Sequence, residues 1–278
     1  MLSCKEIADK IQEDVRNEIT KNNYALTLSF VVVGNDPASK VYVSRKEKVC
    51  SAVGIVSQSH NLQETASEED VIELVRELNE DEGVNGILVQ LPLPRQINPN
   101  KVSDAISHEK DVDGITPINL GRLVSGDPFL VPCTPMGIMA VFEMNQLPIE
   151  GRHAVVIGRS LIVGKPISLL LQNKNATVTM CHSKTADLAV ITAQADILIA
   201  AVGKPKFVTA DMVKKDAVVI DVGINRVEDK LIGDVDYEAV KDKASFITPV
   251  PGGVGLLTVA MLTRNVLTAY KAQKNILL

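Results

Sequence analysis

The sequence predicts an α/β protein made of two successive α/β domains with parallel sheets. Short apolar, β-branched runs alternate with segments whose apolar residues recur every three or four positions, as strands alternate with amphipathic helices. The runs are apolar at consecutive positions, which is typical of parallel strands covered on both faces. The alternation stops in a proline- and glycine-spaced region, residues 116–135, and resumes at Gly151. We therefore expect a domain boundary near Gly121.

The first half is predicted to alternate helices with strands. Ser3 is expected to cap the first helix, Pro37 to open the second and Ser67 to cap the third. In the second helix, Val41, Val49 and Val53 recur at helical spacing. The strands of this half are expected over residues 29–33, 54–62 and 84–91, and a helix over residues 135–145 should join the two halves.

The second half repeats the pattern. Strands are expected over residues 153–157, 176–181, 195–202, 217–222 and 245–250, and helices over residues 163–172 and 256–274. Ligands of parallel sheets bind outside the carboxyl ends of the strands. The segments that follow these strands are therefore the places to search for functional residues.

Composition excludes several classes of protein. The hydrophobic fraction of 46% can build a substantial core, and the net charge of −5 argues against a general nucleic-acid binder. The four cysteines are scattered without a C-x-x-C pair, which favours reduced thiols over a disulfide framework or a zinc site. No apolar run approaches the ~20 residues that span a bilayer, and the N-terminus lacks an apolar leader. We expect a cytoplasmic protein without a metal or a membrane span.

One candidate pocket wall lies on the predicted helix that begins at Pro37. Tyr42 and Lys46 are four residues apart, so they share one helix face just beyond a strand end. Taken alone, a solvated helix face with one stray tyrosine is the better interpretation. Gln90 and Asp113 follow other apolar segments, and an amide with a carboxylate can bind the polar edge of a heterocycle. Taken singly, each would be interpreted as a surface or capping residue.

A glycine-containing turn is expected between the strand at 153–157 and the next helix. Gly158 suits a tight turn and Gly164 a close backbone approach, and the helix N-terminus is expected to offer free N–H groups to phosphate. The spacing is not the G-x-G-x-x-G of dinucleotide sites, so a glycine-rich connection in an ordinary sheet stays open as the alternative.

The end of the next strand bears on the choice of cofactor. An NAD site usually has an acid there, whereas this strand ends in Cys181, His182, Ser183 and Lys184. Arg159 could meet a 2′-phosphate, with Ser183 donating a hydrogen bond. These features favour NADP over NAD. His182 is either a catalytic base or, more plainly, a loop residue beside a phosphate.

A second glycine loop follows the last predicted strand. Residues 249–255 read PVPGGVG, and two prolines with three glycines specify a stiff backbone that can be approached closely. The alternative is a plain turn. That alternative is weak, because a turn rarely needs so many conformationally special residues together.

Taken in order, these motifs resemble the bifunctional methylenetetrahydrofolate dehydrogenase/methenyltetrahydrofolate cyclohydrolase family of the bacterial FolD type. The resemblance runs from about Leu2 to the last helix. It rests on Ser39-x-x-Tyr42-x-x-x-Lys46, residues 86–94 (GILVQLPLP), 110–114 (KDVDG), 132–135 (PCTP), 158–164 (GRSLIVG), His182-Ser183 and 251–255 (PGGVG). Each motif alone is weakly specific, but seven in the same order are highly specific.

The resemblance implies two α/β domains flanking a cleft, the second a Rossmann-like NADP-binding domain. It implies that residues 1–120 with 256–278 bind folate and that residues 121–255 bind NADP. It implies catalytic Lys46, Gln90 and Asp113, with Lys46 as the acid–base residue, Gln90 tuning it and Asp113 holding the pterin. The implied substrate contacts are Tyr42, which stacks on the aminobenzoyl ring, Gln90, Leu91, Asp113, Pro251, Gly252 and Gly253. The implied cofactor contacts are Gly158, Arg159, Ser160, Ser183 and Ile224. A homodimer that uses tetrahydrofolate substrates is implied as well.

The implied chemistry is oxidation of 5,10-methylenetetrahydrofolate to the methenyl cation, followed by hydrolysis to 10-formyltetrahydrofolate. Three other functional interpretations are possible. A dehydrogenase without cyclohydrolase activity would be supported by loss of Lys46 or Gln90, and both are present. A non-catalytic NADP-binding module disagrees with the intact set of polar residues. A shikimate-dehydrogenase-like enzyme is the nearest other substrate class, but residues 89–94 (VQLPLP) do not suit it.

Overall fold

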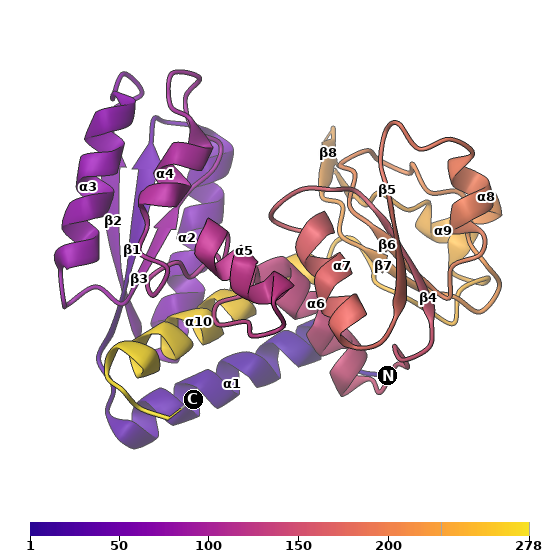
Figure 1. Cartoon of the computed structure of the whole chain (residues 1–278), viewed down its shortest axis with the longest axis horizontal. Coiled ribbons are helices and arrows are strands. Elements are labelled where there is room, and N and C mark those ends of the chain that lie inside the picture. The colour runs from indigo at the N-terminus through magenta and orange to yellow at the C-terminus, as the bar shows by residue number, and fades with distance from the viewer. Residues whose placement is uncertain (229, 278) are drawn as a thin grey trace. The chain divides into compact units, whose positions relative to one another are not determined.

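The computed structural model describes residues 1–228 and 230–277 and divides into two compact units, each with its own parallel sheet (Figure 1). The three-stranded unit comprises Asp9–Cys133 and Val259–Leu278, and the five-stranded unit comprises Met1–Ala8 and Thr134–Thr258. Both units are therefore discontinuous in sequence. The domain bounds expected above stay a prediction.

The three-stranded unit is built on the strand order β2-β1-β3, with both pairs parallel as the sequence predicts. Its strands are β1 (Leu26–Val33), β2 (Ile55–Leu62) and β3 (Gly86–Val89). Its helices are α2 (Pro37–Val53), α3 (Glu68–Glu80), α4 (Pro99–Ala105) and α5 (Pro117–Val124). Three further helices, α1 (Cys4–Asn22), α6 (Cys133–Met144) and α10 (Val254–Gln273), have residues in both units.

Helix α2 begins at Pro37, as its sequence predicts, and ends before Gly54, which was expected in the following strand. The Asp36 side chain accepts a hydrogen bond from the Ser39 N–H at 2.7 Å, and Pro37 occupies the first turn. Gly54 ends the helix in the left-handed conformation, with a φ of 92°. The expected apolar stripe is wrong at Val41, whose side chain is 67% exposed. The buried side of α2 carries Val43, Cys50 and Val53.

Helices α3 and α4 lie side by side over one face of the three-stranded sheet (Figure 1). A capping box opens α3, because Ser67 and Asp70 exchange side-chain and backbone hydrogen bonds. Val75 of α3 and Val102 of α4 are buried in the same cluster as Val31 of β1. This packing fixes the sheet whose strand ends carry several predicted site residues.

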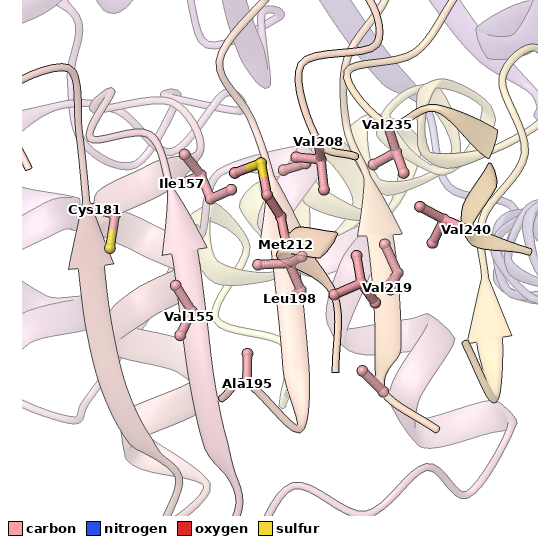
Figure 2. Packing of buried hydrophobic residues seen from close by; sticks show 13 residues of the cluster. Val155, Ile157, Cys181, Ala195, Leu198, Val208, Met212, Val219, Val235 and Val240 are labelled. Carbon is pink, nitrogen blue, oxygen red and sulfur yellow. The ribbon is translucent and has the colours of Figure 1, made fainter. Parts of the chain in front are cut away.

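The five-stranded unit has the strand order β10-β7-β6-β4-β5, and every pair in this sheet is parallel. Its strands are β4 (His153–Ile157), β5 (Thr177–Cys181), β6 (Ile197–Ala200), β7 (Val218–Asp221) and β10 (Phe246–Ile247). Its helices include α7 (Gly164–Asn173), α8 (Leu188–Thr192), η1 (Ala210–Met212) and α9 (Tyr237–Val240). Figure 2 shows the core, where Val155, Leu198 and Val219 of neighbouring strands lie together with Met212.

The structure also contains elements that the sequence did not predict. Helix α5 lies in the proline- and glycine-spaced region, helix α4 lies in a segment for which no element was predicted, and β8 (Asn225–Val227) pairs antiparallel with β9 (Lys230–Ile232). The last predicted strand, residues 245–250, is reduced to the two residues of β10. Among the described residues, no helix is long and apolar enough to span a membrane. Within that same part of the chain, no cluster of His, Cys, Asp and Glu could hold a metal ion.

Candidate active site

The centre of the candidate site is a contact between helix α2 and the end of strand β3. The Lys46 Nζ donates a hydrogen bond to the Gln90 Oε1 at 3.1 Å. Lys46 is half-buried, while Gln90 is only 9% exposed. Two predicted catalytic residues that are 44 positions apart in the chain therefore meet directly.

The amide of Gln90 is fixed at both ends. Its Nε2 donates to the Leu91 carbonyl at 2.5 Å, so its Oε1 is left to face Lys46. The backbone N–H of Gln90 also donates to the Val31 carbonyl at 2.9 Å, which continues the pairing of β3 with β1. The adjoining strand thus determines where the Lys46 ammonium can be held.

Asp113 lies on a loop that runs beside β3. The Ile87 N–H donates to the Lys110 carbonyl at 2.8 Å, and Ile87 forms a parallel bridge with Asp111. Burial raises the pKa of the Asp113 carboxyl, the positive charge of Lys46 lowers it, and the nearby Asp111 raises it. Asp113 is thus electrostatically coupled to the Lys46 side of the site.

The other charged residues of the KDVDG motif have structural partners. The Lys110 Nζ donates to three carbonyls at the end of α3, at 2.7–3.0 Å, and desolvation lowers the pKa of Lys110. Asp111 accepts hydrogen bonds from the Thr116 N–H at 2.8 Å and the Asn119 Nδ2 at 2.9 Å. These contacts shape the loop that carries Asp113.

Asn265 of α10 is a residue that sequence reasoning missed. Its Nδ2 donates to the carbonyls of Val112, at 2.8 Å, and Val131, at 2.9 Å. The Cys133 thiol also donates to the Val112 carbonyl, at 3.3 Å. The residue next to Asp113 is therefore held by two buried donors. No local signal in the sequence indicated this, because Asn265 lies 153 positions from Val112.

Two predicted substrate contacts remain exposed on the three-stranded unit. Tyr42 is 47% exposed and lies one turn before Lys46 on α2, and Leu91 is 39% exposed beside Gln90. An aromatic ring and an apolar side chain beside a polar pair can bind a flat, partly polar ligand.

The glycine turn of the five-stranded unit joins β4 to α7, as predicted. Gly158 has a φ of 125°, and a Cβ on it would overlap the Ala201 carbonyl oxygen. A Cβ on Gly164 would overlap the Gly158 carbonyl oxygen. Both positions therefore require glycine, and the backbone between them forms a tight turn at the carboxyl end of the sheet.

The expectation that α7 offers free N–H groups at its N-terminus is wrong for its first residues. The N–H groups of Val163 and Gly164 donate to the Ser160 Oγ at 3.2 and 3.3 Å, and the Lys165 N–H donates to the Ser160 carbonyl at 3.0 Å. Pro166 has no N–H to offer. The Ser160 hydroxyl thus already accepts the N–H groups at the start of the helix, and the polar side chains around the turn become the main candidates for binding phosphate.

Arg159 and Ser183 follow neighbouring strand ends. The Gly158 N–H donates to the Cys181 carbonyl at 2.9 Å, which ties the turn after β4 to the end of β5. Both side chains are exposed. His182 has a local structural part, because its Nδ1 accepts the Lys184 N–H at 3.2 Å. An arginine and a hydroxyl, with no acid at residues 181–184, suit a phosphate-bearing ribose.

The second glycine loop is tightly constrained at its centre. Gly252 has a φ of 93°, and a Cβ on Gly253 would overlap the Pro249 carbonyl oxygen. Pro251 and Gly252 are exposed. Ile224, which is 48% exposed, lies against the end of this loop, since its Cδ1 is 3.0 Å from the position of a Cβ on Gly255. Three predicted substrate contacts and one predicted cofactor contact are thus neighbours.

The fold and these loops define a two-domain α/β protein with a dinucleotide-type second sheet and a lysine–glutamine pair on the first. Two family models match almost the whole chain. The catalytic domain of tetrahydrofolate dehydrogenase/cyclohydrolase matches residues 2–113, and the NAD(P)-binding domain of the same family matches residues 132–274. The chain belongs to the tetrahydrofolate dehydrogenase/cyclohydrolase family.

Individual relatives agree over nearly their full length. The bifunctional protein FolD of Campylobacter hominis is 54% identical, covering 98% of this chain and 97% of the relative. The crystal structure of the bifunctional FolD of Campylobacter jejuni is similar with a TM-score of 0.95 and 43% identity, covering 97% and 98% of the two chains. The Trypanosoma brucei FolD structure, a complex with NADP cofactor and an inhibitor, has a TM-score of 0.93 and 36% identity, covering 98% and 97%.

Proposed function

We propose that this chain is a bifunctional one-carbon folate enzyme. It oxidises 5,10-methylenetetrahydrofolate to 5,10-methenyltetrahydrofolate with NADP and then hydrolyses the product to 10-formyltetrahydrofolate. The observation that carries this proposal is the Lys46–Gln90 hydrogen bond, with Asp113 coupled to Lys46, inside the region that matches the family's catalytic domain. A dehydrogenase alone would not need that acid–base pair.

The second unit fits NADP. Gly158 makes the backbone turn that a dinucleotide needs, Arg159 supplies a positive charge, and Ser183 supplies a hydroxyl at the adjacent strand end. Ser160 keeps the helix N-terminus in place, and Ile224 offers an exposed apolar surface. When bound, NADP accepts the hydride that leaves the methylene carbon.

The residues of the three-stranded unit perform the proton transfers of the hydrolytic step. In its neutral amine form, the Lys46 Nζ takes a proton from the water that attacks the methenyl carbon, and the resulting ammonium returns that proton to the folate nitrogen as the ring opens. Gln90 accepts a hydrogen bond from Nζ and so restricts where that nitrogen can lie. Asp113 accepts hydrogen bonds from the pterin, Tyr42 stacks on the aminobenzoyl ring, and Leu91 contacts the substrate.

Further assignments belong to the same proposal. Residues 1–120 with 256–278 form the folate domain, and residues 121–255 form the NADP domain. Pro251, Gly252 and Gly253 contact the folate substrate through their backbone, and the glycine at 253 supports this because a side chain there would overlap the Pro249 carbonyl. The protein acts as a homodimer in the cytoplasm.

One assay tests the function directly. The purified protein is incubated with methylenetetrahydrofolate and either NADP or NAD, and the absorbance of the methenyl cation is followed as it forms and decays. We expect formation with NADP, less with NAD, and decay faster than in enzyme-free buffer. A cation that forms but decays at the buffer rate would show a dehydrogenase alone. Absence of turnover with both cofactors would refute the proposed function.

A further inference from the structure

Two buried carboxylates lie at the carboxyl end of the five-stranded sheet, outside the residues assigned so far. Asp221 is the last residue of β7 and is 3% exposed, and Asp234 follows β9 and is 0% exposed. Buried carboxylates need hydrogen-bond donors, because an ionised oxygen without donors is strongly destabilised away from water. The donors of these two residues show which segments they organise.

Asp234 binds two loops that follow strand ends. Its Oδ2 accepts the N–H groups of Val202, at 2.6 Å, and Gly203, at 2.9 Å. Its Oδ1 accepts the Lys204 N–H and the Asn225 Nδ2, both at 2.9 Å. One carboxylate thus holds the turn after β6 and the segment after β7 together.

Asp221 binds the segment that follows β7 and the segment that follows β9. Its Oδ1 accepts the N–H groups of Gly223, at 3.0 Å, and Asp234, at 2.8 Å, and its Oδ2 accepts that of Val235 at 3.0 Å. Val235 then enters the hydrophobic core beside Val208, as Figure 2 shows. The carboxylate pair is therefore anchored to the rigid part of the unit.

Two glycines make room for the two carboxylates in a reciprocal way. A Cβ on Gly223 would overlap the Asp234 Oδ1, and a Cβ on Gly233 would overlap the Asp221 Oδ2. Gly233 directly precedes Asp234 and packs against Asp221, and Gly223 follows Asp221 by two residues and packs against Asp234. A side chain at either position would displace a carboxylate from its hydrogen-bond donors. The residues that depend on one another in this way form one buried cluster: Asp221, Gly223, Gly233 and Asp234.

This buried cluster fixes the position of Ile224. Ile224 stands between Gly223, which donates to Asp221, and Asn225, which donates to Asp234. We infer that Asp234 and Asp221 are positioning residues for the cofactor, because they fix the Ile224 segment and the Val202–Lys204 turn at the dinucleotide end of the sheet. This inference rests on the proposed function, which assigns NADP to that end and Ile224 to its contacts.

The test is Asp234→Asn, which keeps the shape but replaces one acceptor oxygen with a donor facing N–H groups. We expect the KM for NADP to rise at least tenfold, while hydrolysis of supplied methenyltetrahydrofolate falls much less, because Lys46, Gln90 and Asp113 belong to the other unit. Asp236→Asn is the matched control. Asp236 forms an ion pair with Lys206 at 3.2 Å at the surface, and its loss should leave both activities unchanged.

A second variant decides the matter if Asp234→Asn does not fold. Asn225→Ala removes one donor to Asp234 and should raise the NADP KM about threefold with hydrolysis unchanged. An unchanged NADP KM in the folded variants would overturn the inference, as would equal loss of both activities, which indicates a merely structural role. Absence of NADP turnover in the unmodified protein would instead refute the proposed function.

Discussion

The two units hold their candidate site loops in opposite ways. In the three-stranded unit, neutral donors, the Asn265 amide and the Cys133 thiol, bind the Val112 carbonyl next to Asp113. In the five-stranded unit, the carboxylates Asp221 and Asp234 accept backbone N–H groups around Ile224. The Val112 carbonyl is thus held by neutral donors, whereas the Ile224 segment is held through N–H groups by carboxylates.

This difference predicts different responses to pH. An asparagine does not titrate, and burial raises the pKa of the Cys133 thiol well above its usual value, so the two donors to the Val112 carbonyl keep their protons at ordinary pH values. Burial raises the pKa of Asp221 to about 6, although its backbone hydrogen bonds oppose the shift. The loop on the proposed cofactor side is therefore held by a group that changes charge in mildly acidic solution.

The largest expected effect comes from removing the neutral donor. Asn265→Leu leaves the buried Val112 and Val131 carbonyls without that amide, at about 1–3 kcal/mol for each unsatisfied group. We expect the free energy of unfolding to fall by about 2–5 kcal/mol, measured by denaturant titration at pH 6 and pH 8 with the same loss at both. Arg264→Leu, at the adjacent exposed position, should change it by less than about 0.5 kcal/mol. Equal effects of the two substitutions would contradict the claim that the Asn265 amide stabilises the loop next to Asp113.

A smaller effect is expected on the charged side. Arg159→Ala removes the positive charge proposed to bind the 2′-phosphate, and a charge-assisted hydrogen bond contributes about 1.5–3 kcal/mol. The KM for NADP should rise about tenfold or more, with a smaller change for NAD and unchanged hydrolysis of methenyltetrahydrofolate. Arg152→Ala, just before the opposite end of β4, is the matched control. If both arginine variants behave alike, the charge at Arg159 does not select the cofactor.

The smallest predicted effect concerns Asp221 and pH. An unfolded aspartate has a pKa of about 3.9, whereas burial raises the pKa of Asp221 in the folded protein to about 6. The folded protein therefore binds this proton more tightly than the unfolded chain does, and its free energy of unfolding falls when Asp221 ionises. The stabilisation by the protonated Asp221 side chain is fully present below about pH 4 and is lost as the pH rises through about 6. The stability of the unmodified protein relative to Asp221→Asn should thus fall by on the order of 1–3 kcal/mol from pH 4 to pH 7.

Asp211 provides the control of opposite sign. A hydrogen bond from Thr209 lowers the pKa of its exposed carboxyl, so its contribution is lost as the pH falls, not as it rises. Denaturant titrations of the unmodified protein, Asp221→Asn and Asp211→Asn across this range give the comparison. A pH-independent difference for Asp221→Asn would show that its carboxyl keeps an ordinary pKa.

Much of the fold could be predicted because its strands and long helices carry strong local signals. The Ser67 cap and the Pro37 start both lie where the pattern places them. Helix α5 was missed although Thr116 caps it and Pro117 opens it, because its asparagine, glycine and short length are typical of a loop. Helix α4 and the β8–β9 hairpin were missed for the same reason, since each is short.

The candidate site was predictable only where its residues adjoin a motif. Lys46 and Gln90 stand at the ends of recognisable elements, and the structure brings them into contact. The residues that hold the loops could not be found this way. Asn265 acts on Val112 across 153 positions, and Asp234 binds Val202 across 32, and neither distance leaves a local pattern. The free N–H groups expected at α7 were wrong because a serine hydroxyl already accepts two of them.

The most direct test of the proposed function is Lys46→Met, because the Lys46 nitrogen is proposed to transfer protons while the cofactor accepts the hydride. Methionine keeps the apolar stem but removes the nitrogen. We expect hydrolysis of the methenyl cation to fall by about 10²–10⁴-fold while its formation with NADP falls much less, so that the cation accumulates. Lys48→Met, on an exposed position of the same helix, should change neither rate. Equal loss of both activities in Lys46→Met, or loss of neither, would contradict the account.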